Sequence, residues 1–83
     1  MYFIYVLYSI SANKYYVGHT DNIERRLFEH NNGMTRFTSN MASDWKIMYT
    51  ETFESRALAV KREREIKARK SRVYIQSLIA NVG

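Results

Sequence analysis

Five polar side chains scattered along the chain have the chemistry needed to hydrolyse a phosphodiester: Tyr5, Tyr16, Arg26, His30 and Glu63. A phenol can position or deprotonate water, a guanidinium can hold phosphate oxygens, and a carboxylate can hold a divalent metal. Because phosphate esters are anionic, neutralisation of their charge would be the main catalytic contribution. A single carboxylate suits Mg²⁺ or Mn²⁺, hard ions that keep several waters, whereas zinc would need more nitrogen ligands.

Each of these residues also has an ordinary structural explanation. A strand tyrosine is usually a core or interface residue, a helical arginine is usually a surface residue, and His30 could cap an apolar helix stripe. A free tyrosine, with a pKa of about 10, is a weak base at neutral pH unless a nearby cation lowers that pKa. Glu63 is harder to explain structurally, because a lone carboxylate on an inward-facing stripe loses hydration unless a cation compensates for the loss.

Hydrophobic patterning predicts the strands that must position these residues. The apolar and aromatic run at 2–8 is typical of a central strand covered on both faces, and a polar turn at 9–13 leads to a second strand at 14–19 in an antiparallel hairpin. Residues 34–43 have little pattern and are expected to form a loop. A third strand follows, in which every second residue should face one side: Trp45, Ile47, Tyr49, Glu51 and Phe53.

The first helix is predicted to begin at Thr20-Asp21 and to end at Gly33. Asp21 and Glu24 fit a capping box in its acidic form, and Gly33 stands where a glycine commonly follows a helix. Arg26 and His30 lie on or beside the apolar stripe of this helix, whereas Arg25 points elsewhere.

A second helix is expected to open at Glu54 or Ser55 and to run to about Lys70, and a short third helix spans 73–80. Glu63 lies on the inward stripe of the second helix, one turn after Ala59. The fold class is therefore α+β, a small antiparallel three-stranded sheet flanked by helices in the order β-β-α-β-α-α.

The net charge of +5 is concentrated in the second half of the chain. Basic and acidic residues cancel over 1–44, whereas 56–72 holds eight basic residues and two acids. This density is typical of a surface that binds a polyanion such as nucleic acid, although a solvated helix flank would look similar. The candidate contacts to a nucleic-acid backbone are Lys61, Arg62, Lys67, Arg69, Lys70 and Arg72.

Length and composition limit the classes of protein that fit. With 83 residues, the chain is expected to be one domain over 1–83. The absence of cysteine excludes a disulfide framework and a thiolate zinc finger. No apolar run approaches the roughly 20 residues that cross a bilayer, and the start lacks a signal-peptide pattern, so a cytoplasmic protein without a membrane partner is expected.

The order of these residues resembles the core of the GIY-YIG nucleases, specifically their small single-domain bacterial members, and is similar to the UvrC N-terminal nuclease domain. The resemblance covers residues 2 to about 72. The segments that carry it are 4–6 (IYV), 14–18 (KYYVG), 21–31 (DNIERRLFEHN), 37–39 (FTS), 45–49 (WKIMY) and 59–67 (AVKREREIK).

The resemblance implies that Tyr5 and Tyr16 are the two motif tyrosines. It also implies that Gly18 is the motif glycine, which lets the backbone pass close to its neighbours. The first tripeptide has Phe3 in place of the family's glycine, and the second has Val17 in place of isoleucine. Neither change removes a hydroxyl group.

For the helices, the resemblance implies that Arg26 binds phosphate, that His30 assists water or the leaving group, and that Glu63 is the metal ligand. Phe37 stands where small relatives often have tyrosine, so a hydroxyl contact is missing there. Members with known biological roles usually carry an added DNA-binding domain, which is not expected in this chain.

The leading hypothesis is a Mg²⁺- or Mn²⁺-dependent endonuclease that cuts DNA, including structured or branched DNA, by in-line hydrolysis. Either Tyr16 or Tyr5 would act as the base or orient the water. An alternative is a catalytically weak module that keeps the scaffold and grips nucleic-acid phosphates without reading bases. A purely structural homodimer is a third alternative and would need an exposed apolar patch.

Overall fold

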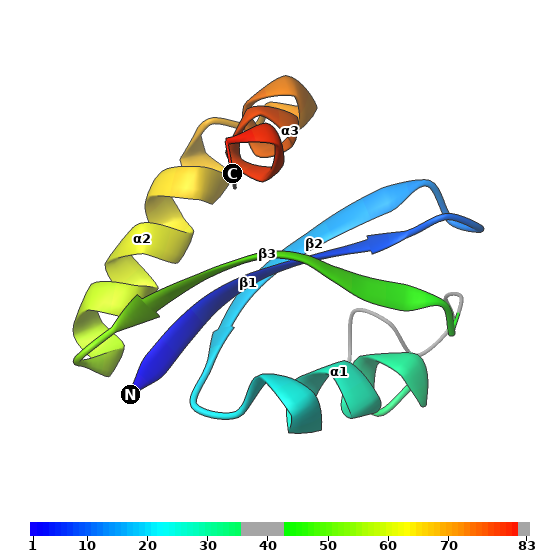
Figure 1. Ribbon diagram of the computed structural model, residues 1–83, viewed down its shortest axis with the longest axis horizontal. Coiled ribbons are helices and arrows are strands. Elements are labelled where there is room, and N and C mark those ends of the chain that lie inside the picture. Colours follow the sequence, from blue (N-terminus) through cyan, green and yellow to red (C-terminus); the bar gives the residue numbers. More distant parts are fainter. Residues whose placement is uncertain (36–42, 82–83) are drawn as a thin grey trace.

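The computed structural model describes residues 1–35 and 43–81, and Phe37 lies outside them. The elements follow the predicted order (Figure 1): β1 (Tyr2–Ser9), β2 (Lys14–Thr20), α1 (Ile23–Asn31), β3 (Trp45–Phe53), α2 (Arg56–Ala68) and α3 (Arg72–Ala80). The predicted α+β class is confirmed. Within the described ranges, no helix has both the length and the apolar character that a membrane span requires.

The sheet has the strand order β2-β1-β3, and both pairings are antiparallel. The apolar strand β1 is therefore central, as its sequence predicts, and β2 is an edge strand. In the β1–β2 register Tyr5 lies opposite Gly18 and Leu7 lies opposite Tyr16.

Helices cover both faces of this sheet, with α1 on one face and α2 and α3 on the other (Figure 1). Side chains alternate along β1, so Tyr5 and Leu7 enter the core beneath α1, whereas Ile4 and Val6 enter the core beneath α2 and α3. These four side chains are at most 1% exposed. The molecule thus has two small cores that share one strand.

An irregularity in β3 changes the predicted alternation. Tyr49 pairs with Val6 and Ile47 pairs with Leu7, so Met48 is left without a partner in the register. Such a β-bulge reverses the side on which the following residues point. As a result Trp45 packs beneath α1 whereas Tyr49 packs beneath α2 and α3, which corrects the prediction that both face one side.

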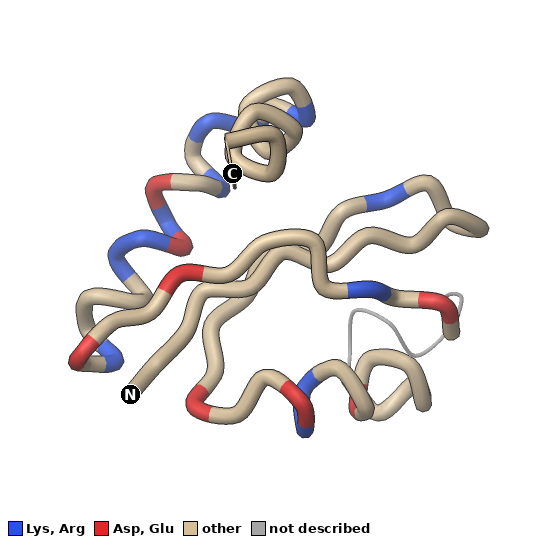
Figure 2. The backbone as a smooth tube through the Cα atoms, in the orientation of Figure 1, with Lys and Arg blue, Asp and Glu red and all other residues tan. Residues whose placement is uncertain are grey.

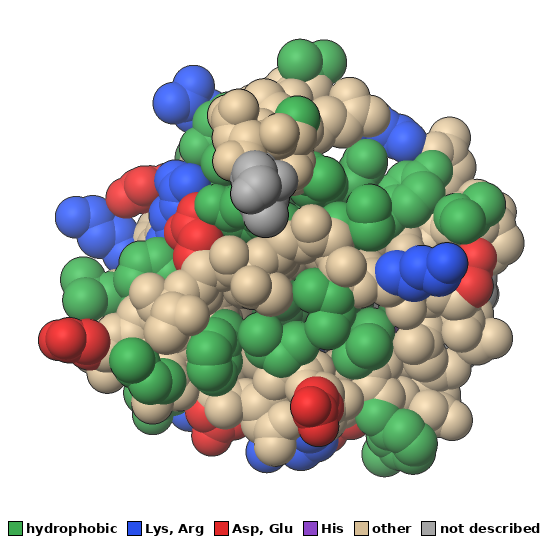
Figure 3. Space-filling view, viewed as in Figure 1, with side chains coloured by type: hydrophobic (Ala, Val, Ile, Leu, Met, Phe, Trp, Pro, Cys, Tyr) green, Lys and Arg blue, Asp and Glu red, His purple; other side chains and the backbone are tan. Residues whose placement is uncertain are grey.

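The bulge also leaves apolar surface at the free edge of the sheet. Ile47 is 39% exposed and Met48 is 40% exposed. Figure 3 shows hydrophobic side chains spread across this view of the molecule, with basic side chains gathered towards α2.

The first helix begins one residue later than predicted. Asn22, not Asp21, is the N-cap, and its side chain accepts a hydrogen bond from the Arg25 N–H. Thr20 causes the shift, because it continues β2 and its hydroxyl accepts from the Asn22 N–H at 3.0 Å. Asp21 pairs with the Arg25 side chain instead.

The end of α1 is as predicted and is tied to β3. Gly33 follows the C-cap with a left-handed φ of 66°, and the Met34 N–H donates to the Glu29 carbonyl. The Asn31 side chain accepts from the Trp45 N–H at 2.7 Å and donates to the Trp45 carbonyl at 3.1 Å. This clamp fixes the helix against the sheet.

Serines cap the other two helices, Ser55 for α2 and Ser71 for α3. Between these helices Lys70 has a left-handed φ of 48°, a conformation that costs a non-glycine residue energy. Helix α2 therefore ends at Ala68, short of the predicted Lys70.

Candidate active site

The two predicted tyrosines lie together beneath α1 because they come from facing strands with matched alternation. Their rings are stacked, with centroids 6.1 Å apart. Gly18 lies against both rings, since a Cβ atom at this position would lie 2.5 Å from the Tyr5 hydroxyl and 3.0 Å from a Tyr16 ring carbon. The absence of a side chain at Gly18 is therefore what allows the two phenols to occupy this place.

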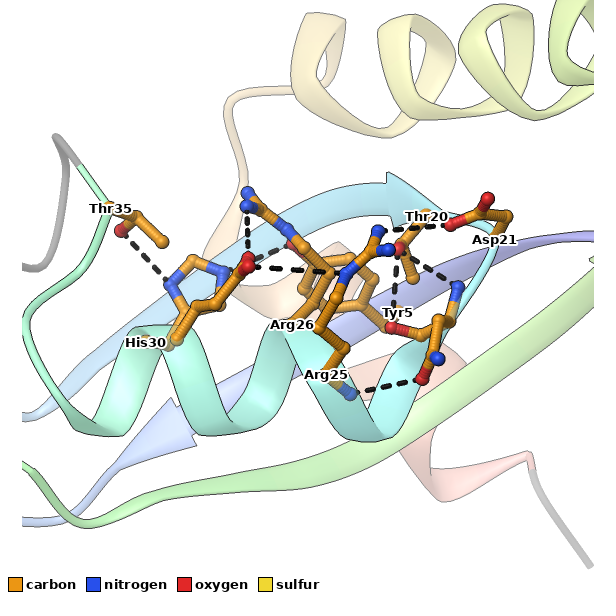
Figure 4. Close-up of polar contacts among 9 residues, drawn as sticks. Tyr5, Thr20, Asp21, Arg25, Arg26, His30 and Thr35 are labelled. Atoms are coloured by element: carbon orange, nitrogen blue, oxygen red, sulfur yellow. Dashed lines mark hydrogen bonds and ion pairs between the residues drawn. The ribbon is translucent and has the colours of Figure 1, made fainter.

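His30 comes from α1 and lies against both phenols; Figure 4 shows it with Tyr5 and Thr35. Its Nε2 lies 3.1 Å from the Tyr5 hydroxyl, and its Nδ1 lies 3.3 Å from the Thr35 hydroxyl. The centroids of the Tyr16 and His30 rings are 4.5 Å apart. His30 has no solvent exposure, so both ring nitrogens are bonded within the protein.

Burial keeps both partners of the Tyr5–His30 hydrogen bond neutral. Desolvation lowers the pKa of His30 to about 4, assisted by the nearby positive charge of Arg26. Desolvation also raises the pKa of Tyr5 to about 12, against the opposing influence of Arg26. A tyrosine that acts as a base at neutral pH would need a nearby cation to lower its pKa. For Tyr5 the burial effect is larger, and the phenol stays protonated.

The two tyrosines differ in access. Tyr5 is 1% exposed, whereas Tyr16 is only half-buried and lines a groove beside β2. Of the two phenols, only that of Tyr16 is therefore placed to meet a substrate without rearrangement of the core.

Arg26 points towards Tyr5 from the inner side of α1 (Figure 4), as the helix pattern predicts. Its guanidinium donates to Glu29 at 2.8 Å, and its side chain remains 30% exposed. Arg25 instead turns outward to Asp21 at 3.0 Å. The structure thus separates the two neighbouring arginines as the sequence predicts.

A polar hollow of about 190 Å³ opens beside Arg26. Its lining includes three arginines, Arg25, Arg26 and Arg56, together with His19 and one acid, Asp21, which pairs with Arg25. Several N–H donors that converge on one small hollow form an environment suited to a phosphate group.

Glu63 reaches this region from α2, across the edge strand β2. Its Oε1 lies 2.8 Å from His19 Nδ1, and its Oε2 accepts from Lys67 Nζ at 3.0 Å. The carboxylate is close enough to Tyr5 that its charge contributes to the raised pKa of that phenol. Lys67 Nζ also lies 5.8 Å from the Tyr16 ring centroid. Glu63 therefore belongs to the same region as the tyrosines, although it comes from the opposite side of the sheet.

His19 was not singled out by the sequence reasoning. The inward position of Glu63 predicts that some cation compensates for its burial, but the partner's identity depends on how α2 is placed over β2. His19 lies opposite Ile4 in the β1–β2 register, and this alternation brings its side chain to the face that α2 covers.

Besides Asp21 and Glu29, which pair with Arg25 and Arg26, this region holds the carboxylate of Glu63, the predicted metal ligand. Among the described residues, no group of three His, Cys, Asp or Glu side chains could hold one. Mg²⁺ commonly takes one or two protein carboxylates and completes its shell with waters and substrate phosphates. The Glu63 carboxylate, with its side chain 18% exposed, fits that manner of binding and does not fit a closed structural site.

The predicted backbone-binding residues divide into two groups. Lys and Arg are concentrated along α2 (Figure 2), and Lys61, Lys67 and Lys70 are exposed there or just beyond its end. Arg62 instead binds both oxygens of Glu51, at 2.9 and 3.0 Å, and holds α2 to β3. Its charge is already paired within the protein, which makes it a poor contact for a polyanion.

The remaining two arginines are held by aromatic rings. Arg69 lies 4.6 Å from the ring centroid of Tyr74. Arg72 lies 5.1 Å from that of Tyr15 and donates to the Asn13 carbonyl at 3.1 Å. Both side chains remain on exposed residues.

Comparison with known proteins gives a consistent assignment. The family model of the GIY-YIG catalytic domain matches residues 1–76. A UPF0213 protein of Natronomonas pharaonis is 35% identical over 79 residues, which cover 95% of this chain and 91% of the relative. A UPF0213 protein of Listeria innocua is 38% identical over 65 residues, which cover 78% of this chain and 71% of the relative. The solution NMR structure of a UPF0213 protein from Bacillus halodurans is 25% identical and has a TM-score of 0.60, covering 100% of this chain and 87% of that one.

Proposed function

Because the chain belongs to the GIY-YIG family, a family of nucleases, we propose that it is a divalent-metal-dependent endonuclease that hydrolyses phosphodiester bonds in DNA. The observation that supports this most directly is the convergence at β2. Tyr16, Arg26 and Glu63 come from three different elements: the Tyr16 ring stacks on that of Tyr5, and the charges of Arg26 and Glu63 both act on the Tyr5 phenol. A phenol, a guanidinium and a carboxylate brought together beside a polar hollow are the groups that phosphodiester hydrolysis needs.

Arg26 is the phosphate-binding group in this proposal. It lines the polar hollow, keeps 30% of its side chain exposed and has a fixed orientation from its bond to Glu29. Its planar guanidinium can donate two parallel hydrogen bonds to phosphate oxygens, and it would stabilise the charge that develops there during hydrolysis.

Tyr16 orients the attacking water, because it is the more accessible phenol. Tyr5 and His30 are positioning residues. Both residues are neutral at pH 7, and a hydrogen bond closed off from solvent joins them. Their two rings lie against the Tyr16 ring and hold it in place. This differs from the role that the resemblance implied for His30, which has no exposure through which to touch water or a leaving group.

Glu63 would hold Mg²⁺ or Mn²⁺. Such an ion would supply charge neutralisation at the scissile phosphate. The chain's own contribution is to fix the carboxylate, and His19 does so through its 2.8 Å contact with Oε1. Titration calorimetry of Mn²⁺ into the wild type and Glu63→Gln provides a readout apart from cleavage, with binding expected to be lost in the variant.

The experiment that tests the function compares wild type, Arg26→Ala and Glu63→Gln on linear duplex, branched and single-stranded DNA with Mg²⁺, Mn²⁺ or EDTA. Lys46→Ala is the control for loss of one positive charge, because Lys46 is exposed on β3 and does not line the hollow. Loss of one preorganised donor to a transition state typically lowers the rate by roughly 10²- to 10³-fold, so we expect a loss of that size for Arg26→Ala and little change for Lys46→Ala. Equal activity in Arg26→Ala and Lys46→Ala, or cleavage that persists in EDTA, would contradict the proposal.

A second candidate function, a nucleic-acid-binding module with weak cleavage, is favoured by one observation. Both oxygens of Glu63 are already occupied, one by His19 and one by Lys67. If this pairing excluded metal, the wild type would bind DNA and fail to cut it. Mn²⁺ binding measured by calorimetry without DNA, and again with a non-hydrolysable phosphorothioate oligonucleotide, distinguishes the two functions.

A further inference from the structure

An open groove of about 480 Å³ runs along the edge strand β2, between that strand and the helices α2 and α3. Its lining includes Tyr16 and Lys67, and the Lys67 ammonium lies 3.0 Å from the Glu63 carboxylate and 5.8 Å from the Tyr16 ring centroid. Lys14 and Arg72 also line the groove. The groove is therefore continuous with the candidate active site.

The floor of the groove is apolar and the rim is basic. Tyr15, Val17, Ile66 and Ile75 form the floor, and Tyr15 packs against Tyr8 with ring centroids 4.7 Å apart. Four basic side chains line the rim, those of Lys14, Lys67, Lys70 and Arg72, and no acidic residue is among the described residues that line the groove. This combination matches a ligand that has an aromatic part and carries negative charge.

We propose that this groove binds one unpaired nucleotide of the DNA strand next to the bond that is cut. This inference rests on the proposed endonuclease function and specifies its substrate class, namely DNA that is single-stranded on one side of the scissile phosphate. The base lies on the apolar floor beside the Tyr15 ring, and the adjoining phosphates lie along the lysines.

Size and charge support this occupant over a duplex. A volume of 480 Å³ falls within the range of pockets that enclose small ligands, roughly 300–1,000 Å³. A base that enters such a groove cannot stay paired with its complement. Proteins that bind single strands commonly join a basic track to aromatic side chains on which bases stack.

Lys70 is the residue best suited to test the inference. It is exposed, it lines the groove, and it adopts the left-handed conformation at the end of α2. Glycine would adopt that conformation with less strain. Lys70→Gly should therefore stabilise the fold while it removes a phosphate contact, so that stability and binding change in opposite directions. A purely structural lysine would not behave in this way.

The experiment measures binding in EDTA by fluorescence anisotropy, so that its result does not depend on cleavage. Fluorescent probes are an eight-nucleotide single strand, a gapped duplex and a fully paired duplex of the same sequence, each at several salt concentrations. The variants are Lys70→Glu and Lys70→Gly. Lys46→Glu is the matched control. Lys46 is an exposed lysine on β3, away from the groove, and its substitution changes the charge by the same amount.

We expect the wild type to bind the single strand and the gapped duplex at least about tenfold more tightly than the paired duplex. Lys70→Glu should weaken single-strand binding about tenfold. It should also lower the slope of log affinity against log salt by roughly one unit, which is the contribution of one phosphate contact. Lys70→Gly should weaken binding less and raise the melting temperature, and Lys46→Glu should leave single-strand affinity within about twofold of wild type.

Equal effects of Lys70→Glu and Lys46→Glu, or equal affinity for paired and unpaired DNA, would overturn the groove assignment while leaving the endonuclease function intact. Tighter binding of the matched RNA oligonucleotide would overturn the assignment to DNA. If the protein binds single strands through Lys70 but cuts none of the substrates above, the proposal for the groove is supported and the proposed endonuclease function is contradicted.

Discussion

The buried hydrogen bond between Tyr5 and His30 sets the chemistry of the site at the scale of single residues. A histidine with no exposure is held in its neutral form, because protonation would place a charge in a desolvated core close to Arg26. The neutral ring bonds on both sides, to Tyr5 and to Thr35. The geometry that fixes Tyr16 therefore depends on the protonation state of a residue that substrate does not touch.

This pair predicts how stability changes with pH. The pKa of His30 is about 4 in the folded protein and about 6.5 when unfolded, so the unfolded state binds more protons as the pH falls through this window. Stability should be fully present above about pH 6.5 and should fall as the pH decreases towards 4, with a loss of about 2 kcal/mol between pH 7 and pH 5. Urea unfolding at closely spaced pH values measures this slope.

In the variant His30→Gln, the free energy of unfolding should no longer fall between pH 7 and pH 5, whatever its value at pH 7. Asp44 and Glu51 also have lowered pKa values, but carboxylates such as these affect stability only below about pH 4.5. An unchanged slope in His30→Gln would assign the titration to another group.

At the scale of elements, the ion pair between Arg62 and Glu51 holds α2 to β3. Arg62 binds both oxygens of Glu51, and Tyr49 donates to the same carboxylate. The side chains of Arg62 and Glu51 are 23% and 21% exposed. Such a pair differs from the exposed pairs along α1, because removal of one partner leaves a partly desolvated charge behind.

We expect Arg62→Met to lower the free energy of unfolding by about 2 kcal/mol, since it leaves Glu51 without its cation. Arg25→Met is the comparison, because Arg25 and Asp21 are 54% and 51% exposed and an exposed pair contributes at most about 0.5 kcal/mol. Denaturant unfolding of both variants measures the difference. If the double variant Arg62→Met with Glu51→Gln regains most of the lost stability, the unpaired Glu51 carboxylate is the cause of the loss. Equally small losses of stability in Arg62→Met and Arg25→Met would contradict this account.

At the scale of the whole molecule, the candidate site is assembled from both faces of the sheet. Tyr5, Tyr16 and Arg26 belong to the α1 side, whereas Glu63 belongs to the α2 side. The two halves meet at the edge strand, where Gly18 lies against the two phenols and the next residue, His19, contacts Glu63. The sheet therefore separates two cores but does not separate the two parts of the site.

Gly18→Ala tests this junction. The added Cβ would lie 2.5 Å from the Tyr5 hydroxyl and 2.7 Å from the adjoining ring carbon, so a buried ring must move. Overpacking of this kind typically costs about 1–3 kcal/mol, and we expect cleavage to fall more than 100-fold because the tyrosines are displaced.

Gly33→Ala is the control, because Gly33 has a left-handed φ of 66° at the end of α1 and its substitution should cost about 1 kcal/mol. It should lower stability while it preserves most of the cleavage rate. Melting temperature and initial cleavage rate, measured on the same samples, separate the two effects. Wild-type activity in Gly18→Ala would show that the phenols do not need their present positions.

The sequence predicts the order of elements because its patterns are local. The continuous apolar run of β1, the polar turn after it and the serine before α2 each determine their own segment. The face of a helix on which a residue lies is also set by local spacing, which is why the sequence distinguishes Arg26 from Arg25. What the sequence does not predict is set by contacts between distant segments. The bulge at Met48 depends on pairing with β1, and the choice of His19 as the partner of Glu63 depends on how α2 lies over β2.

The pKa of Tyr5 is a further case. A tyrosine that acts as a base needs a cation to lower its pKa, and Arg26 does lie beside Tyr5. The magnitude of desolvation could not be known before the packing of α1 was known, and this larger influence raises the pKa instead.

Lys67 has a consequence for the resting state of the protein. Its ammonium lies 3.0 Å from the Glu63 carboxylate and beside the Tyr16 ring, so it acts as a built-in counterion before any nucleic acid arrives. An incoming phosphate would attract the same ammonium. If Lys67 turned towards that phosphate, the negative charge of Glu63 would lose this counterion. Under the proposed function, binding of substrate would therefore free Glu63 to bind a metal ion, whereas without substrate the Glu63 charge is compensated by Lys67.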